Sequence, residues 1–216
     1  IVGFPIPIII ALIINEMKGR FKKVTQTVLY APHFISLVVL VSILNSMLSP
    51  SQGVVNTILE MLGRERIYFM ADPKYFRHLY VWSGVWQGMG WGAIIYLAAL
   101  SGVDPVLHEA ADIDGATRLQ KILHINIPTI LPTIIIMLIL RMGQVISVGY
   151  EKVYLMQNSM NVETAEVIST YVYKRGILNS NYSFSAAVGL FNNVVNVILV
   201  LFANWISKKV SKTSLF

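Results

Sequence analysis

The amino-acid sequence predicts an all-α membrane protein, a polytopic helical bundle with about five spans. Hydrophobic residues make up 55% of the 216 positions and charged residues 13%, where soluble domains carry about 25% charged residues. The mean hydropathy is correspondingly high, at +0.63. The apolar residues also gather in runs of the length that a helix needs to cross a bilayer. Helices are the expected form because each then satisfies its own backbone hydrogen bonds in hydrocarbon.

The expected spans follow the apolar runs in chain order. They are residues 1–15, 28–48, 79–100, 128–148 and 184–206. The sequence begins inside the first run without a basic leader, so we expect a fragment that has lost its N-terminus rather than a signal peptide. The whole of 1–216 is expected to form a single transmembrane domain.

Polar connections separate the runs and predict an orientation. The connection 49–78 contains Pro50, Gly53 and Pro73, and a short helix is expected within it near 54–62. Nine Lys and Arg residues lie in 16–27, 101–127 and the tail after residue 206, against seven in the other two connections. Basic residues favour the cytoplasmic side of a membrane, so the loop 101–127 is predicted to be cytoplasmic.

The loop 101–127 is the most informative stretch of the chain. Asp104 and Pro105 are typical of a helix N-cap and first helical position. The short helix that they begin has one apolar face, made of Val106, Leu107, Ala110 and Ala111. Gly115 supplies the residue with positive φ that ends such a helix. A second amphipathic turn is expected through Leu119, Ile122 and Leu123, closed by Pro128. A short polar helix held outside the bilayer is a docking element for a soluble partner.

The spacing of this loop resembles the EAA loop of permease subunits of binding-protein-dependent ABC importers. That pattern is E-A-A, three residues, G, nine residues and I-x-L-P, and Glu109, Gly115, Ile125 and Pro128 fall on it. Ile127 stands in place of the usual leucine. The resemblance implies the type I (MetI-like) permease fold, with 101–127 as its cytoplasmic coupling loop.

The resemblance also implies a set of partners and a role for the loop. The partners are cytoplasmic ABC ATPase subunits, which bind ATP and Mg, a second permease subunit and an extracytoplasmic solute-binding lipoprotein. The setting is the bacterial cytoplasmic membrane, crossed several times. Glu109 is expected to face a basic residue in a cleft of the ATPase, where a charge-assisted hydrogen bond fixes the docking geometry. The expected coupling residues are Glu109, Ala110, Ala111, Asp114, Gly115 and Pro128.

Other segments resemble the oligosaccharide and polysaccharide branch of these permeases. They are Ala71–Pro73, the span that carries Trp82 and Trp86, Tyr96–Leu100, Tyr30–Phe34 and Gly176–Phe184. The resemblance therefore implies a carbohydrate cargo.

Polar residues inside or beside the apolar runs are candidates for the substrate path. A charge such as Arg141 costs about 2.5–3.5 kcal/mol within a bilayer helix and usually faces a cavity. Gln144 follows it at helical spacing, and Tyr150 and Glu151 come next. Snorkelling of Arg141 to the membrane surface is the alternative.

Each of two side-chain stripes allows two interpretations. Asn192, Asn193 and Asn196 lie on one side of the fifth span, where their amides suit either sugar hydroxyls or contacts between helices. Gly84, Gly88 and Gly92 lie four apart in the third span, and they allow either tight internal packing or the approach of a second subunit.

Several classes of function find no support. The chain has no cysteine and no G-x-x-x-x-G-K-[ST] phosphate loop, so it is predicted to bind no ATP in that way. The four histidines are scattered without metal spacing, and no nucleophile set occurs. We therefore expect neither an enzyme nor a cofactor in this chain. The net charge of +6 comes from residues that flank spans, which argues against nucleic-acid binding.

Three alternatives remain. The same fold could import an amino acid, a peptide or a phosphonate. The chain could be a channel or scaffold without an ATPase. An intramembrane enzyme would need paired ionisable groups at one depth, whereas Arg141 alone lies well inside an expected span.

Overall fold

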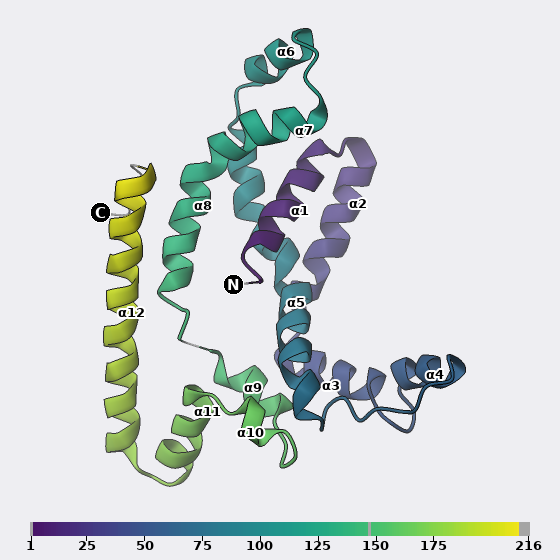
Figure 1. Ribbon diagram of the computed structural model, residues 1–216, viewed down its shortest axis with the longest axis vertical. Coiled ribbons are helices and arrows are strands. Elements are labelled where there is room, and N and C mark those ends of the chain that lie inside the picture. The colour runs from purple at the N-terminus through teal and green to yellow at the C-terminus, as the bar shows by residue number, and fades with distance from the viewer. Residues whose placement is uncertain (1, 147, 212–216) are drawn as a thin grey trace. The chain divides into compact units, whose positions relative to one another are not determined.

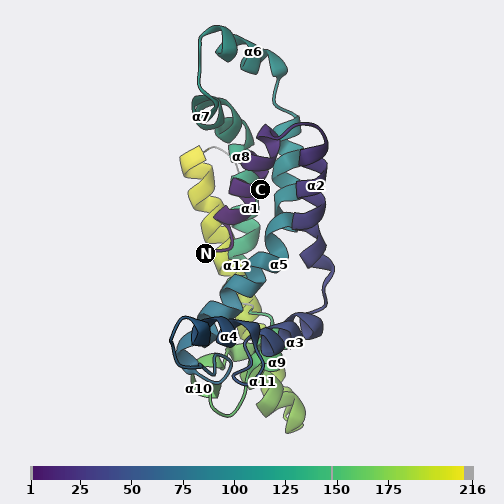
Figure 2. The same cartoon turned by 90° about the vertical axis from the view of Figure 1, so that its right-hand side faces the viewer.

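The computed structural model describes residues 2–146 and 148–211, and every regular element in these ranges is helical (Figures 1 and 2). The α-helices are α1 (Pro5–Glu16), α2 (Gly19–Tyr30), α3 (Leu37–Met47), α4 (Val54–Met61), α5 (Pro73–Ser101), α6 (Pro105–Ile113), α7 (Arg118–Lys121), α8 (Ile127–Met142), α9 (Tyr150–Met156), α10 (Val162–Ala165), α11 (Ile168–Val172) and α12 (Tyr182–Ser211). A 3-10 turn, η1 (Ala31–Phe34), and two π-helical turns, η2 (Ile122–Asn126) and η3 (Tyr173–Leu178), join some of them. The predicted all-α class is confirmed, as is the short helix α4.

The helices form two compact units, and neither unit is continuous in sequence. Unit 1 contains the residues up to His33, Val85–Val145 and the residues from Val195 onward. Unit 2 contains Phe34–Gly84 and Ile146–Val194. Helices α5 and α12 each contribute one part to unit 1 and the other part to unit 2.

The core of unit 1 lies where α1 packs against α5 and α8. Its buried side chains are Ala11, Leu12, Ala93, Tyr96, Leu100, Val103 and Ile130. Small residues bring the helices together here. A Cβ on Gly90 would lie 2.5 Å from the carbonyl carbon of Leu29 in α2, and one on Gly92 would lie 3.1 Å from Cγ of Pro7 in α1. Gly88 has no heavy atom within 4 Å of that position, so the expected glycine stripe does not act as one packing surface inside unit 1.

The core of unit 2 joins α3, the first part of α5 and α9. Its buried side chains are Val41, Leu48, Met70, Phe76, Val153, Met156 and Ala165. The backbone that leads into and out of α4 is irregular, and its polar groups need partners.

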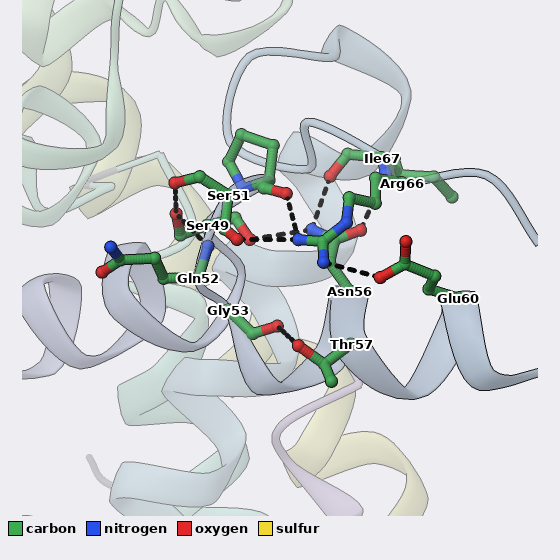
Figure 3. Close-up of polar contacts among 10 residues, drawn as sticks. Ser49, Ser51, Gln52, Gly53, Asn56, Thr57, Glu60, Arg66 and Ile67 are labelled. Atoms are coloured by element: carbon green, nitrogen blue, oxygen red, sulfur yellow. Dashed lines mark hydrogen bonds and ion pairs between the residues drawn. The ribbon is translucent and has the colours of Figure 1, made fainter.

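Asn56 in α4 supplies those partners (Figure 3). Its side chain is fully buried. Nδ2 lies 2.9–3.2 Å from the carbonyl oxygens of Leu48, Ser49 and Ile67, and Oδ1 accepts the Ile67 N–H at 2.7 Å. Arg66 donates to the carbonyls of Pro50 and Ser51 and forms an ion pair with Glu60 at 2.6 Å. Together these contacts join the two ends of the connection between α3 and α5 and hold it in one conformation.

The second expected span, 28–48, is not one helix, so that prediction is wrong. Helix α2 ends at Tyr30, and α3 begins only at Leu37. Pro32 has no N–H to continue the α-helical hydrogen bonds, and the backbone changes at Ala31 to the 3-10 turn η1, which ends at Phe34. Ser36 then starts a new helix because its Oγ accepts the Val39 N–H at 3.3 Å, as an N-cap does. The predicted polar connection 16–27 is in large part the helix α2.

The fourth expected span, 128–148, begins earlier and ends sooner than predicted. Helical backbone runs without interruption from Arg118 to Met142, and Gly143 caps its end. Pro128 does not close the preceding turn. The π turn η2 pairs the Ile127 N–H with the Ile122 carbonyl, and this wider turn accommodates a proline that lacks an N–H. Residue 147 lies outside the described residues.

Length and composition support fewer unbroken spans than five. Within the part of the chain that the structure describes, two helices, Arg118–Met142 and Tyr182–Lys209, are long and apolar enough to cross a membrane. The count rises to four if the broken pairs α2–α3 and α5–α6 each form one span, and α1 adds a shorter apolar helix. Helix α12 exposes a series of large apolar side chains, including Leu190, Phe191, Val197, Phe202 and Trp205, as a helix facing lipid or another membrane subunit does.

We expect Asn56→Ala to destabilise the protein by about 3 kcal/mol, because several buried backbone groups lose their partner at once. Unfolding in mixed micelles at rising SDS concentration measures the effect. Asn45 is exposed on α3, so Asn45→Ala is the matched control and should change the midpoint little. Equal midpoints for the two variants would show that the Asn56 contacts add nothing.

The glycines of α5 give a second matched pair. Gly90→Ala should destabilise by about 1–3 kcal/mol, because the added methyl group overpacks the contact with Leu29. Gly88→Ala should be neutral or stabilise by up to about 1 kcal/mol, since alanine favours a helix interior. The same SDS titration on the isolated subunit measures both. A destabilised Gly88→Ala variant would contradict the open space beside Gly88.

Candidate coupling loop and substrate path

Helix α6 begins with the cap that the sequence predicts. The Asp104 Oδ1 accepts the Val106 N–H at 2.9 Å, and Pro105 occupies the first turn, where no N–H is needed. An N-cap bond of this kind contributes about 1 kcal/mol to a helix, which matters in an element of nine residues.

The end of α6 is a Schellman motif centred on Gly115. The Ala116 N–H donates to the Ala111 carbonyl at 2.9 Å, and the Gly115 N–H donates to the Asp112 carbonyl at 3.2 Å. Gly115 has φ +71°, in the left-handed region that a side chain disfavours. Asp114 is the C-cap residue just before it. The turn predicted at Gly115 is therefore confirmed.

Helix α7 has its own cap and is tied back to α6. Gln120 donates its N–H to Oγ1 of Thr117 at 3.4 Å, and its Oε1 accepts the Thr117 N–H at 2.8 Å, which completes a capping box. The Lys121 Nζ lies 2.7 Å from Oδ1 of Asp112. The hydrogen bond from Lys121 lowers the pKa of the Asp112 carboxyl. The loop is thus held by its own hydrogen bonds and one ion pair.

The surface of α6 is open to a partner. Figures 1 and 2 show α6 beyond the ends of α1 and α2 in unit 1. Val106 is 62% exposed and Leu107 48%, and Glu109 and Ala110 are exposed beside them, with Ala111 half-buried. Among residues 2–146 and 148–211, the Glu109 carboxylate has no hydrogen-bond or ion-pair partner. An apolar patch with one unpaired carboxylate is suited to dock in a cleft that carries a cation.

The junction between the loop and α8 contains a buried amide. Asn126, the last residue of η2, is fully buried, and neither its Nδ2 nor its Oδ1 has a hydrogen-bond partner among the residues that the structure describes. It lies one turn before Ile130, a core residue of unit 1. The loop therefore enters α8 through the core, with Pro128 exposed just after the π turn.

The expected path residues are divided between the two units. Unit 1 contains Arg141, Gln144 and Asn196, and unit 2 contains Tyr150, Glu151, Asn192 and Asn193. In unit 1, Arg141 lies in the last turn of α8, at the end of the membrane-length helix Arg118–Met142 and not near its middle. A cation in a last turn suits the helix dipole. The expected helical spacing of Gln144 from Arg141 is wrong. Gln144 lies in the turn after Gly143, so it does not share a helical face with Arg141.

Sequence reasoning missed Lys152, which directly follows Tyr150 and Glu151 in the chain. Lys152 is 7% exposed, and its Nζ donates to the Tyr80 carbonyl at 2.9 Å and lies 4.9 Å from the centroid of the Tyr80 ring. Gly84 leaves room for it, because a Cβ there would lie 3.1 Å from Nζ. Desolvation by burial lowers the pKa of Lys152 to about 8. The apolar partners Val153 and Met156 on the same face of α9 are the signal that could have indicated its burial.

Lys152 gives a pH-dependent prediction. Its pKa is lower in the folded protein than the ordinary 10.5, so between pH 8 and 10.5 the unfolded chain holds a proton that the folded protein has released. Folding stability should therefore rise with pH across this window through this residue. Thermal unfolding at a series of pH values should show a smaller rise for Lys152→Met than for the wild type. Parallel curves for the two proteins would show that the lysine is not desolvated.

The described residues contain no group of three or more His, Cys, Asp and Glu residues placed to hold a metal ion.

Comparisons with known proteins match the chain over almost its whole length. Residues 3–212 match the family described as binding-protein-dependent transport system inner membrane component. The chain is 45% identical to protein LplB of Bacillus subtilis, over 99% of this chain and 68% of LplB. It is 42% identical to the polygalacturonan/rhamnogalacturonan transport system permease protein YteP of the same organism, over 99% of this chain and 67% of YteP.

A solved structure matches almost the whole chain. It is a bacterial alginate ABC transporter in complex with an alginate pentasaccharide-bound periplasmic protein. The matched chain is 44% identical and superimposes with a TM-score of 0.94, over 99% of this chain and 74% of that one. The chain therefore belongs to the family of binding-protein-dependent transport system inner membrane components, the membrane permease subunits of ABC transporters.

Proposed function

We propose that this chain is the membrane-spanning subunit of an ATP-driven importer and forms part of the path for an oligosaccharide or polysaccharide. The observation that best supports this proposal is the exposed surface of α6. This helix projects from unit 1 (Figure 1), and among the described residues its Glu109 is unpaired beside an exposed apolar patch. In this proposal α6 docks on a separate ATPase that binds ATP and Mg, so the chain itself performs no chemistry. The further partners are a second permease subunit and an extracytoplasmic solute-binding protein, in the bacterial cytoplasmic membrane.

The internal bonds of the loop support this role. The Schellman motif at Gly115 and the ion pair of Asp112 with Lys121 join α6 to α7, and helical backbone continues from α7 through η2 into α8. When the ATPase displaces α6, these bonds and the continuous helical backbone transmit the displacement to α8. Alternating access is a two-state equilibrium that such differential contacts bias.

The carbohydrate cargo is supported by the relatives. The name of YteP refers to polygalacturonan and rhamnogalacturonan, and the matched solved structure is an alginate transporter. Another solute, such as an amino acid, a peptide or a phosphonate, is the competing proposal, and the ligand bound by the partner binding protein decides between them. Failure to co-purify any ATPase from native membranes would instead favour a channel or scaffold.

We expect Glu109→Lys to uncouple ATP hydrolysis from uptake while leaving folding intact. Reversing the charge places two cations together at the docking surface, which costs several kcal/mol, so uptake should fall by about tenfold or more. The measurement is saccharide uptake and ATPase activity of the complete transporter in proteoliposomes.

Glu65→Lys is the control, because Glu65 is also exposed but lies in unit 2, outside the coupling loop. It should retain uptake. Normal uptake by Glu109→Lys would contradict the assigned role of α6, and equal losses in both variants would point to charge reversal in general.

A further inference from the structure

Helix α2 of unit 1 has one exposed face that combines cations with large apolar side chains. Residues three and four apart on a helix share a side, and the exposed residues of this face are Arg20, Phe21, Lys23, Val24, Thr27 and Val28. We propose that this face binds an anionic phospholipid, with the headgroup phosphate at Arg20 and Lys23 and an acyl chain along Val24 and Val28. Lipid binding of this kind goes beyond the proposed import function.

The apolar part of the face is suited to hydrocarbon. Phe21 is 68% exposed, Val24 59% and Val28 65%. Thr27 lies between them, but its hydroxyl donates to the Lys23 carbonyl at 3.0 Å, so its polar group is satisfied within the helix. The other side of α2 faces the protein, since α2 lies beside α1 and α5 (Figures 1 and 2) and its Leu29 is close to Gly90 of α5.

Two cations lie at the N-terminal end of the same face without a counter-charge. Among residues 2–146 and 148–211, the side chains of Arg20 and Lys23 form no ion pair or hydrogen bond. The first turn of α2 contains no acidic residue, although a helix dipole favours acidic residues there and disfavours cations. An anion from outside the chain would therefore balance charge that the described residues leave unbalanced.

The order of charged and apolar residues matches a lipid better than a soluble anion. Val28 lies about 12 Å beyond Arg20 along the helix axis, from the rise per residue of an α-helix. A phospholipid has the same order, with its phosphate followed by acyl chains, and the long side chains of Arg and Lys extend to headgroups at such a boundary. Free phosphate would leave the apolar part uncovered, and a zwitterionic lipid would leave the positive charge unbalanced.

The predicted orientation agrees with this ligand. Residues 16–27 are expected on the cytoplasmic side of the membrane, where anionic lipids attract basic segments. Helix α2 is also the first half of the bent pair with α3 that together is apolar enough for one span. The cations of the face therefore lie at the end of that pair, and Val24 and Val28 follow toward its middle.

The test uses the absence of cysteine from the chain. The complete transporter, with every cysteine of the other subunits replaced, carries Thr27→Cys labelled with a bimane fluorophore and is placed in phosphatidylcholine nanodiscs. The probes are phosphatidylglycerol and phosphatidylcholine with dibrominated acyl chains, because bromine quenches a fluorophore that it contacts. The phosphatidylglycerol probe should reach half-quenching at a mole fraction about tenfold lower or less, since each cation favours anionic lipid by about fivefold.

A charge-neutralising variant and a matched control test the recognition groups. Arg20→Gln combined with Lys23→Gln should abolish the preference for phosphatidylglycerol and leave quenching by the phosphatidylcholine probe unchanged. Lys22→Gln removes a cation of the same helix that is half-buried and outside the exposed face, so it should keep most of the preference. Inorganic phosphate, added at constant ionic strength, should not displace the phosphatidylglycerol probe.

Four results would overturn the site. Equal quenching by both lipids would show contact with ordinary bilayer lipid, and quenching by neither would show that another subunit covers the face. A preference that survives in the double variant, or that falls as far in Lys22→Gln, would mean that Arg20 and Lys23 do not recognise the headgroup. Displacement by inorganic phosphate would show a site for a soluble anion. None of these results depends on which solute the transporter imports.

Discussion

The fold depends on satisfying backbone hydrogen bonds at the places where its helices stop. Within a helix every residue finds its partner locally, but an irregular segment leaves carbonyl and N–H groups unpaired, and in an apolar protein little water is present to take them. Buried and half-buried asparagines solve this problem in unit 2. Asn56 pairs the backbone on both sides of α4, and Asn158 and Asn161 tie the segment after α9 to Met70. The shape of unit 2 follows from these amides as much as from its apolar core.

The coupling loop uses a different solution, which is entirely local. Asp104, Gly115 and Thr117 each close a helix end with a partner only a few residues away. The loop can therefore keep its shape while exposing almost all of its surface. This arrangement leaves Glu109 and the apolar side chains of α6 available, because none of them is needed to hold the loop together.

The same contrast explains what the sequence could predict. The caps at Asp104 and Gly115 depend on neighbouring residues, so pattern alone located them. The break after Tyr30 also has local causes, in Pro32 and Ser36, but the apolar run around them hid the break. The bonds of Asn158 and Asn161 to Met70 join residues about 90 positions apart, and no local pattern indicates such a partner. The burial of Lys152 beside the exposed Glu151 depends on the packing of α9 against α5 in the same way.

The interleaving of the two units has a consequence for synthesis of the protein. The chain passes from one unit to the other four times, near residues 33, 84, 145 and 194. The last of these passages lies inside α12, so neither unit is complete until that helix has left the ribosome. A nascent chain that stops after α11 lacks part of both units, and no earlier point in translation yields a finished unit that could fold ahead of the rest. Of the described residues, those of α12 are therefore the last that both units need for their packing.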